Sequence, residues 1–183
     1  MYRFQLILHR ISTMFKQPLL FLSLLVTLLA CNETNKPATT AEEIVVPSMG
    51  GEFRGVSIGD DYEKVLNIDP ANTLYSMPDE IVYRLPVKDA SGTWYEITYN
   101  FKERGLYDIC LEIFPSDSNT SQTVSGDLLK LYKDKYGIPV EDKGYKSWRI
   151  MTANAHVITV DLTDSLIKHG KQMIQVRYNE SEK

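Results

Sequence analysis

Cysteine and histidine are scarce in this chain, which has two cysteines and three histidines in 183 residues. A zinc site needs several His, Cys or carboxylate ligands, usually in recognisable local spacing, and no such cluster surrounds His156 or His169. His156 follows the apolar phase of a predicted strand, so we expect it to pack at the edge of the core, whereas His169 lies in a polar turn. Cys110 has no base beside it in the sequence and is expected to be an inert, half-buried thiol. We therefore expect neither a metal nor a cofactor.

Signatures of catalysis are also missing. The sequence contains no glycine-rich loop that could cradle a phosphate and no serine nucleophile elbow. Its acidic clusters, at residues 60–63 and 161–164, lack the alternating ligands and the glycine of a calcium loop. A glycoside hydrolase needs two carboxylates that face each other across a cleft, and nothing in the sequence identifies such a pair. We expect no catalytic residue and no enzyme; a carboxylate-based hydrolase stays open as an alternative.

An excess of positive charge is absent as well. The chain carries 20 Lys and Arg against 24 Asp and Glu, which gives a net charge of −4. Proteins that bind nucleic acids present basic patches, so we expect no nucleic-acid partner.

The apolar run near the N-terminus is too short to cross a membrane. It covers residues 19–30, is interrupted by Ser23 and Thr27, and follows three basic residues. A helix that spans a bilayer needs about 20 apolar residues, whereas the apolar part of a secretory signal peptide has roughly 7–15 and a basic segment before it. Residues 1–30 are thus predicted to be a signal peptide; an uncleaved anchor or a buried helix is the alternative.

The end of this run, Leu28-Leu29-Ala30-Cys31, resembles the lipobox of bacterial lipoproteins. The resemblance implies cleavage before Cys31, acylation of Cys31 and attachment to a membrane of the cell envelope, with the outer membrane favoured. Two or more acyl chains hold a protein stably on a membrane. If Cys31 carries lipid, Cys110 has no partner, and no intrachain disulfide is expected.

Residues 31–51 are predicted to form a flexible tether. They consist mainly of Asn, Thr, Lys, Pro, Ala, Glu and Ser, and their only apolar cluster is Ile44-Val45-Val46. So little apolar surface does not offset the entropy cost of ordering a chain. The alternative is a short first strand at residues 44–46. Residues 52–183 are expected to form a single α+β domain.

Two helices are predicted in this domain. The first begins near Asp60, which is the expected N-cap, with Glu63 completing a capping box and Pro70 stopping the helix. The second has Ser121 as its expected N-cap and Gly137 just beyond its C-terminus. Its apolar stripe consists of Val124, Leu128, Leu131, Tyr132 and Tyr136.

Six strands are predicted from the alternation of apolar and polar residues. They cover residues 81–85, 94–101, 107–114, 148–150, 156–162 and 174–178. Turns at residues 89–92 and 102–105 are expected to join the first three, with glycine supplying a positive φ. We expect an α+β fold in which two helices pack on one face of a mostly antiparallel sheet of about six strands. The order, a helix and three strands twice, suggests a tandem duplication.

Residues 53–60, followed by Val65, resemble the helix-opening segment of small envelope lipoproteins of the SmpA/OmlA type. The tandem order is also similar to the fold of the β-lactamase-inhibitor protein. The Tyr-Gly-Ile-Pro sequence at residues 136–139, between the second predicted helix and the next strand, resembles the helix-to-strand connection of such folds. The resemblance implies an α+β scaffold that binds other proteins.

Trp94 and Phe114 fall on the polar phase of their strands, beside Arg84, Glu96 and Arg177. Aromatic residues and arginine are enriched at protein interfaces, so these five residues are the predicted interaction surface; burial of the two rings under a loop or the tether is the alternative. We expect a non-enzymatic, membrane-anchored lipoprotein that binds a protein or an envelope polymer. A carrier with a small-ligand cavity between helices and sheet is the first alternative.

Overall fold

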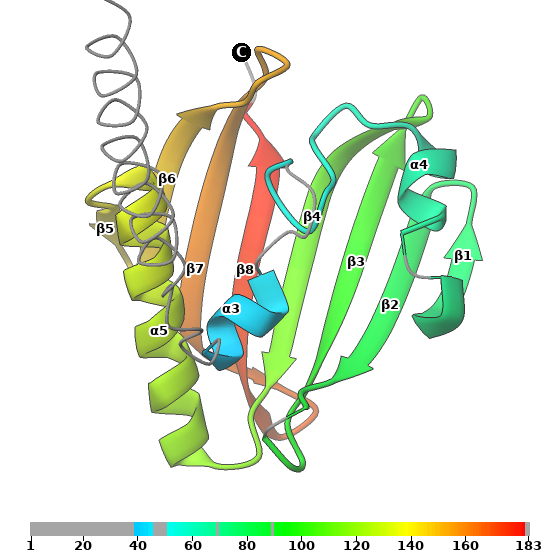
Figure 1. Cartoon of the computed structure of the whole chain (residues 1–183). Helices are drawn as coiled ribbons and strands as arrows, with labels where there is room; N and C mark the ends of the chain where they lie inside the picture. The colour runs from blue at the N-terminus through cyan, green and yellow to red at the C-terminus, as the bar shows by residue number, and fades with distance from the viewer. Residues whose placement is uncertain (1–38, 46–50, 69, 89, 182–183) are drawn as a thin grey trace, which may run out of the picture. The chain divides into compact units, whose positions relative to one another are not determined.

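An antiparallel sheet of eight strands organises the part of the chain that the computed structural model describes, residues 39–45, 51–68, 70–88 and 90–181. The order across the sheet is β1-β2-β3-β4-β8-β7-β6-β5 (Figure 1). The strands are β1 (Thr73–Met77), β2 (Glu80–Pro86), β3 (Trp94–Lys102), β4 (Gly105–Phe114), β5 (Val140–Asp142), β6 (Tyr145–Met151), β7 (Val157–Lys168) and β8 (Lys171–Glu180). The predicted α+β class with an antiparallel sheet is confirmed, although the described residues form eight strands rather than about six and three α-helices rather than two.

Two consecutive four-stranded meanders make up this sheet. Strands β1 to β4 run from one edge to the centre, strands β5 to β8 run from the other edge, and β4 pairs with β8 in the middle. A helix precedes each meander, α4 (Tyr62–Leu66) in the first half and α5 (Ser118–Tyr136) in the second. The repeated order is therefore a helix and four strands, where the sequence indicated a helix and three strands.

The two strands that the sequence analysis missed are the edge strands. In β1 one half-buried residue is followed by four exposed ones, and the three residues of β5 are all exposed. A strand that buries neither face is not stabilised by apolar side chains at every second position. Its sequence therefore lacks the alternation of apolar and polar residues from which strands are predicted. Backbone pairing with β2 and β6 holds these strands in the sheet.

A short helix, α3 (Thr40–Val45), lies inside the segment predicted to be a tether. Ala41, Ile44 and Val45 are buried, and α3 packs against α5. These three residues fall on one face of a helix, so their burial favours a helix over a tether or a strand. The prediction of a flexible tether is wrong for residues 40–45. Cys31 and the predicted signal peptide lie outside the described residues, as do residues 31–38 and 46–50.

Hydrogen bonds close both ends of α3. The Thr39 hydroxyl accepts from the backbone N–H of Glu42 (3.2 Å), and the Glu42 carboxylate accepts from the N–H of Thr39 (2.7 Å). This reciprocal pair is a capping box. At the other end, Nη1 of Arg54 donates to the carbonyl oxygen of Ile44 (2.9 Å), a group that has no partner within the helix.

The first predicted N-cap is displaced by one residue. Helix α4 is capped by Asp61, whose carboxylate accepts from the backbone N–H of Lys64 (2.8 Å). Asp60 instead accepts from the N–H of Ser57 in the preceding loop (2.7 Å). The capping box predicted for Asp60 and Glu63 is therefore wrong, because Glu63 lies only two positions after the true cap.

The second helix begins four residues earlier than predicted. Asp117 is the N-cap of α5 and accepts from the backbone N–H of Thr120 (2.9 Å), whereas Ser121 is buried in the first turn. Gly137 ends α5 with a φ of 87°, as predicted. Pro70 does not end α4, which stops at Leu66, but opens the 3-10 turn η1 (Pro70–Asn72).

A β-bulge in β4 changes the predicted side-chain phase. Asn100 pairs with Asp108 and Phe101 with Leu106, which leaves Tyr107 without a pairing partner across β3. The alternation places Tyr107 on the apolar face, but it is exposed, and Leu106 is buried instead. An extra residue in one strand reverses the facing of every residue before it.

Only one of the two predicted turn glycines has a positive φ. Gly92 has a φ of 82°. Between β3 and β4, Glu103 and Arg104 adopt φ values of 53° and 73°, the combination that two-residue hairpin turns require. Gly105 is therefore the first residue of β4 rather than the residue that supplies the positive φ.

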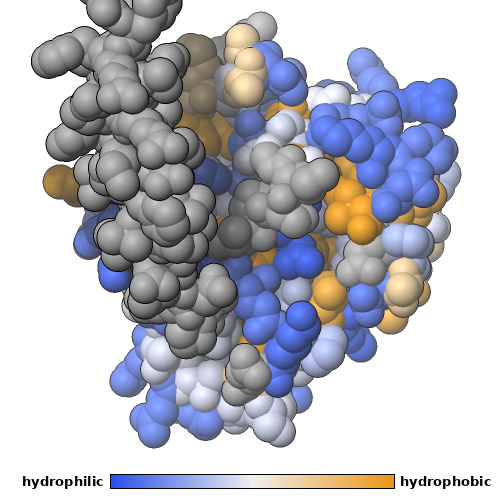
Figure 2. All heavy atoms as spheres, in the orientation of Figure 1, coloured by the Kyte–Doolittle hydropathy of each residue, from blue (hydrophilic) through white to orange (hydrophobic). Residues whose placement is uncertain are grey.

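The core lies between one face of the sheet and the helices (Figure 1). Val124, Leu128 and Tyr132 of α5 are buried against it, and the hydroxyls of Tyr132 and Tyr178 form a hydrogen bond of 2.6 Å. The hydroxyl of Tyr83 donates to the Val65 carbonyl oxygen at 2.9 Å, which attaches α4. Viewed from this side, the described surface is mainly hydrophilic, with hydrophobic residues visible in the hollow between the outer elements (Figure 2).

Candidate interaction face

The opposite face of the sheet carries none of the described helices, and we call it the helix-free face. Strand pairing aligns its residues in rows across the sheet. One row consists of Val82, Thr98, Cys110, Arg177 and Asp161, and the next of Arg84, Glu96, Glu112, Gln175 and Thr163. A third contains Trp94 and Phe114, which pair directly. The five predicted interaction residues thus share this face.

Arg84, Trp94 and Phe114 form a stack. The ring centroids of Trp94 and Phe114 are 3.9 Å apart at an interplanar angle of 13°, and the Arg84 guanidinium lies 4.9 Å from the Trp94 centroid. Nε of Arg84 also donates to the Glu96 carboxylate at 2.7 Å. Trp94 is half-buried and Phe114 is buried. Phe114 is thus buried, as in the alternative, but under the Trp94 ring rather than under a loop or the tether.

Arg177 belongs to a separate polar cluster. Its Nε donates to the Asp108 carboxylate at 2.6 Å, and the Asn100 side-chain amide donates to the other oxygen of Asp108 at 2.8 Å. The hydrogen bond with Asp108 raises the pKa of Arg177 above its usual value. Asp108 is buried although it is ionisable, which is tolerable because both of its oxygens have partners. Arg177 is therefore held in place and does not join the aromatic stack.

The acids and the thiol of this face do not form a catalytic arrangement. Glu96 and Glu112 are directly opposite each other on β3 and β4, but Arg84 pairs with the first and Lys168 with the second. Burial raises the pKa of the Cys110 thiol to about 12, with Glu112 contributing. The thiol is thus protonated at neutral pH, and a protonated thiol is a poor nucleophile.

Large apolar side chains lie exposed at both edges of the helix-free face. At one edge, Tyr75 is 41% exposed and Met77 is 56% exposed. At the other, Val140 is 72% exposed and Met151 is 73% exposed, with Tyr145 beside them on β6 at 42%. By strand pairing, all five share the face of the ion pairs. They were not predicted as site residues because the sequence pattern indicates neither β1 nor β5 and indicates too short a β6.

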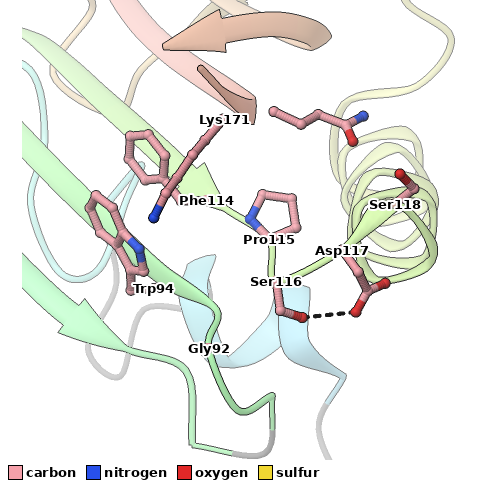
Figure 3. Close-up of a pocket in the computed structure, with 9 residues that line it drawn as sticks. Gly92, Trp94, Phe114, Pro115, Ser116, Asp117, Ser118 and Lys171 are labelled. Carbon is pink, nitrogen blue, oxygen red and sulfur yellow. Dashed lines mark hydrogen bonds between the residues drawn. The ribbon is translucent and has the colours of Figure 1, made fainter. Parts of the chain in front are cut away.

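A pocket of about 270 Å³ lies where this face meets the start of α5 (Figure 3). Trp94 and Phe114 form one wall, the chain from Pro115 to the first residue of α5 another, and Lys171 with Gln172 a third. In Figure 3 the Lys171 side chain extends toward the Trp94 ring. The pocket joins the ends of the hairpin strands β3 and β4 to the start of β8, which is far from them in the sequence.

Asp117 is the carboxylate of this pocket, and it is already bound. It accepts from Thr120 N (2.9 Å), from the Thr120 hydroxyl (3.0 Å) and from the Ser116 hydroxyl (3.0 Å). These hydrogen bonds, above all the one from the Thr120 backbone, lower the pKa of Asp117. Among the described residues, Lys171 has no ion pair and the Trp94 indole N–H has no hydrogen bond. The free polar groups of the pocket are therefore mainly donors.

Neither of the two histidines in the described residues, His156 and His169, lines this pocket. Nδ1 of His156 is 3.0 Å from the Glu180 carboxylate, and its other ring nitrogen faces Gly59. His169 is exposed in the β7–β8 turn. Within the described residues, no group of three His, Cys, Asp or Glu side chains is placed to hold a metal ion. The same part of the chain contains no helix with the length and apolar character of a membrane span.

The SmpA/OmlA-type resemblance and the lipobox stay predictions. Comparison of the chain with protein-family models, with curated proteins and with solved structures found no match.

Proposed function

We propose that this protein is a lipid-anchored envelope protein that binds another protein through its helix-free face. The observation that carries the proposal is the set of exposed residues on that face. They are Tyr75, Met77, Arg84, Tyr145, Arg149, Met151 and Arg177, with Trp94 half-exposed among them. Aromatic residues, methionine and arginine are the residue types enriched at protein interfaces.

The size of the face fits a protein partner. Eight strands spaced about 4.8 Å apart span roughly 34 Å, and six residues of strand extend about 20 Å. The resulting area of roughly 700 Å² is close to the 800 Å² or so that each partner contributes to a standard interface. A small-molecule site would need a deeper concavity than a sheet surface provides.

The arginines of the face are pre-organised for binding. Arg84 is held by Glu96 and lies against the Trp94 ring, and Arg177 is held by Asp108. About half of each arginine side chain is nevertheless exposed, 52% for Arg84 and 49% for Arg177. Side chains that are already ordered lose less conformational entropy when a partner binds. Arginine and tryptophan in such positions are common hot spots of interfaces.

Anchoring through Cys31 is the other half of the proposal, and it rests on the lipobox resemblance. Cys31→Ala should abolish lipidation and release the protein from membranes, which fractionation of cells and mass spectrometry would measure. Cys110→Ala is the matched control and should leave the protein in the membrane fraction. Retention of the Cys31→Ala variant at the wild-type level would contradict the anchor.

The repeated order of a helix and four strands supports a tandem duplication of one ancestral unit. The two units meet at β4 and β8, which pair antiparallel, so a two-fold relation between the halves is the expected consequence. The same order supports the similarity to α+β scaffolds that bind other proteins.

A photo-crosslinking experiment tests the protein-binding proposal. A benzophenone side chain is placed at Met151, which is exposed on the helix-free face, and, as the control, at Lys130, which is exposed on α5. Illumination of intact cells should yield one discrete crosslinked species from position 151 and none from position 130. A second benzophenone probe is placed at Tyr75, at the other edge of the face. Equal crosslinking at positions 151 and 130, or no crosslinking from either position 151 or position 75, would contradict the proposal.

The carrier and the hydrolase are weaker alternatives. One cavity over β2 and β3, lined by Ile68, Tyr83 and Leu85 among others, measures about 10 Å³, which is the space of about one water molecule. The larger hollow beside α3, about 290 Å³, is lined by the charged side chains of Glu43, Arg54 and Lys88 among others, which suit a haem or a lipid poorly. The paired Glu96 and Glu112 lie on a sheet surface and each is bound by a cation, whereas a glycosidase acid must stay protonated in a cleft.

A further inference from the structure

The pocket at the start of α5 holds more hydrogen-bond donors than acceptors. Within the described part of the chain, four of its lining side-chain groups have no partner: the Trp94 indole N–H, the Lys171 ammonium, the Gln172 side-chain amide and the Ser118 hydroxyl. The Asp117 carboxylate, by contrast, accepts three hydrogen bonds. It also caps α5, so the start of that helix is not open to a ligand. A ligand that completes the pocket must therefore bring acceptor atoms.

Lys171 is the cation that a ligand would neutralise. It pairs across the β7–β8 hairpin with Lys168, and like charges directly opposite each other destabilise a sheet. Lys168 is compensated by Glu112. No described carboxylate compensates Lys171, which extends toward Trp94 at the pocket wall (Figure 3).

We propose that this pocket binds a carboxylate group, with one oxygen on the Lys171 ammonium and the other on the indole N–H of Trp94. A carboxylate carries one negative charge and accepts at two oxygens, which matches one free cation and one neighbouring donor. A phosphate dianion matches less well, because it would place a second negative charge near Asp117. The proposal does not rest on the protein partner proposed above, although both sites include Trp94, and Lys171 is the residue that distinguishes them.

The wall formed by Trp94 and Phe114 limits which groups attached to the carboxylate can contact the protein. One face of the Trp94 ring is covered by Phe114 and the other by Arg84. A sugar ring therefore has no open indole face on which to stack, and the ligand meets the ring edge and Pro115 instead. A volume of about 270 Å³ admits the carboxylate with a small group attached. Both the C-terminus of a polypeptide and a uronic acid have this chemistry.

Nuclear magnetic resonance of the two tryptophans tests the proposal in the full chain. The ¹⁵N-labelled protein, purified in detergent, has two indole N–H signals, because it has two tryptophans, and a Trp94→Phe variant assigns them. The indole of Trp148 is buried and donates to the Gly137 carbonyl oxygen at 2.8 Å, so its signal serves as an internal reference. The probes are N-acetylglycine, glucuronate, inorganic phosphate and the neutral N-acetylglycinamide.

N-acetylglycine, glucuronate or both should shift the Trp94 signal and leave the Trp148 signal in place, while N-acetylglycinamide should shift neither. Comparison of the two acids identifies a polypeptide end or a uronic acid as the better source of the carboxylate. Lys171→Met keeps roughly the length of the side chain and should lower the affinity for the acid about tenfold or more. Lys130→Met on α5 should leave that affinity unchanged. Unchanged affinity in Lys171→Met, no shift with either acid, or a shift with phosphate alone would overturn the proposal.

Discussion

The two faces of the sheet are built from the same strands and differ in how their side chains find partners. On the helix-covered face, Ile109, Val160 and Tyr178 are completely buried in a cluster of aliphatic and aromatic side chains. On the helix-free face, the long side chains form ion pairs with their neighbours while the apolar residues at the edges stay exposed. One face thus supplies the free energy of folding through burial. The other pairs the charges of Arg84, Lys168 and Arg177, leaves Lys171 without an ion pair among the described residues, and retains apolar surface for an additional partner.

The largest expected effect is on the helix-covered face. Leu128 is completely buried between α5 and the sheet, so Leu128→Ala should lower the free energy of unfolding by about 3 kcal/mol, through lost burial and the cavity that remains. Urea denaturation followed by circular dichroism measures this loss. Lys130→Ala on the same helix is the matched control and should change the stability by less than about 0.5 kcal/mol. Equal losses in the two variants would contradict the assignment of the buried stripe.

The next effect tests whether α3 belongs to this face. Ile44 is completely buried, so Ile44→Ala should cost about 2 kcal/mol, at the lower end for such a truncation because α3 is short. The Val140→Ala variant, at an exposed position of β5, should have nearly no effect. If residues 40–45 were a flexible tether, Ile44→Ala would not lower the free energy of unfolding. Wild-type stability of that variant would therefore support the tether predicted from the sequence.

The helix-covered face was largely predictable from the sequence because its signals are local. The stripe of α5 repeats at helical spacing, and β2, β3, β4, β7 and β8 alternate with a period of two. Helix α3 also had a local signal that was overlooked, since Thr39 and Glu42 have the spacing of a capping box. That signal is weak without knowledge that α5 covers Ile44, because a six-residue helix is unstable alone.

The helix-free face was less predictable because its partners come from distant strands. Trp94, Arg84 and Glu96 were found because neighbouring hairpin strands bring them together. The ion pair of Arg177 and Asp108, in contrast, depends on the pairing of β4 with β8, which joins the two meanders. The same long-range pairing brings Lys171 beside Trp94, so no local pattern could have indicated the pocket.

Replacing Trp94 tests the functional side of the comparison. Trp94→Ala should remove the stack on Phe114 and weaken the proposed complex by about 2 kcal/mol, which is more than tenfold, as truncation of an interface hot spot does. Loss of the crosslinked species at Met151, with the thermal unfolding transition still cooperative, is the expected result. Thr98→Ala on the same face is the control, because Thr98 is a small half-buried residue. If Trp94→Ala crosslinks as the wild type does, the stack of Arg84, Trp94 and Phe114 is not part of the interface.

The smallest expected effect concerns an acid held by α5 rather than by a cation. The Asp164 carboxylate accepts from the Ser125 hydroxyl at 2.6 Å, and this hydrogen bond is the main reason that its pKa is lowered. Because the folded protein has the lower pKa, the contribution of Asp164 to stability is present above the unfolded pKa of about 3.9 and is lost as the pH falls through the folded value. Asp164→Asn should therefore lower the stability by less than about 1 kcal/mol at pH 7 and by a vanishing amount near pH 2. Urea denaturation at both pH values measures the difference, with the exposed Asp134→Asn on α5 as the control. A loss of equal size at both pH values would show that the hydrogen bond from Ser125 does not depend on the charge of Asp164.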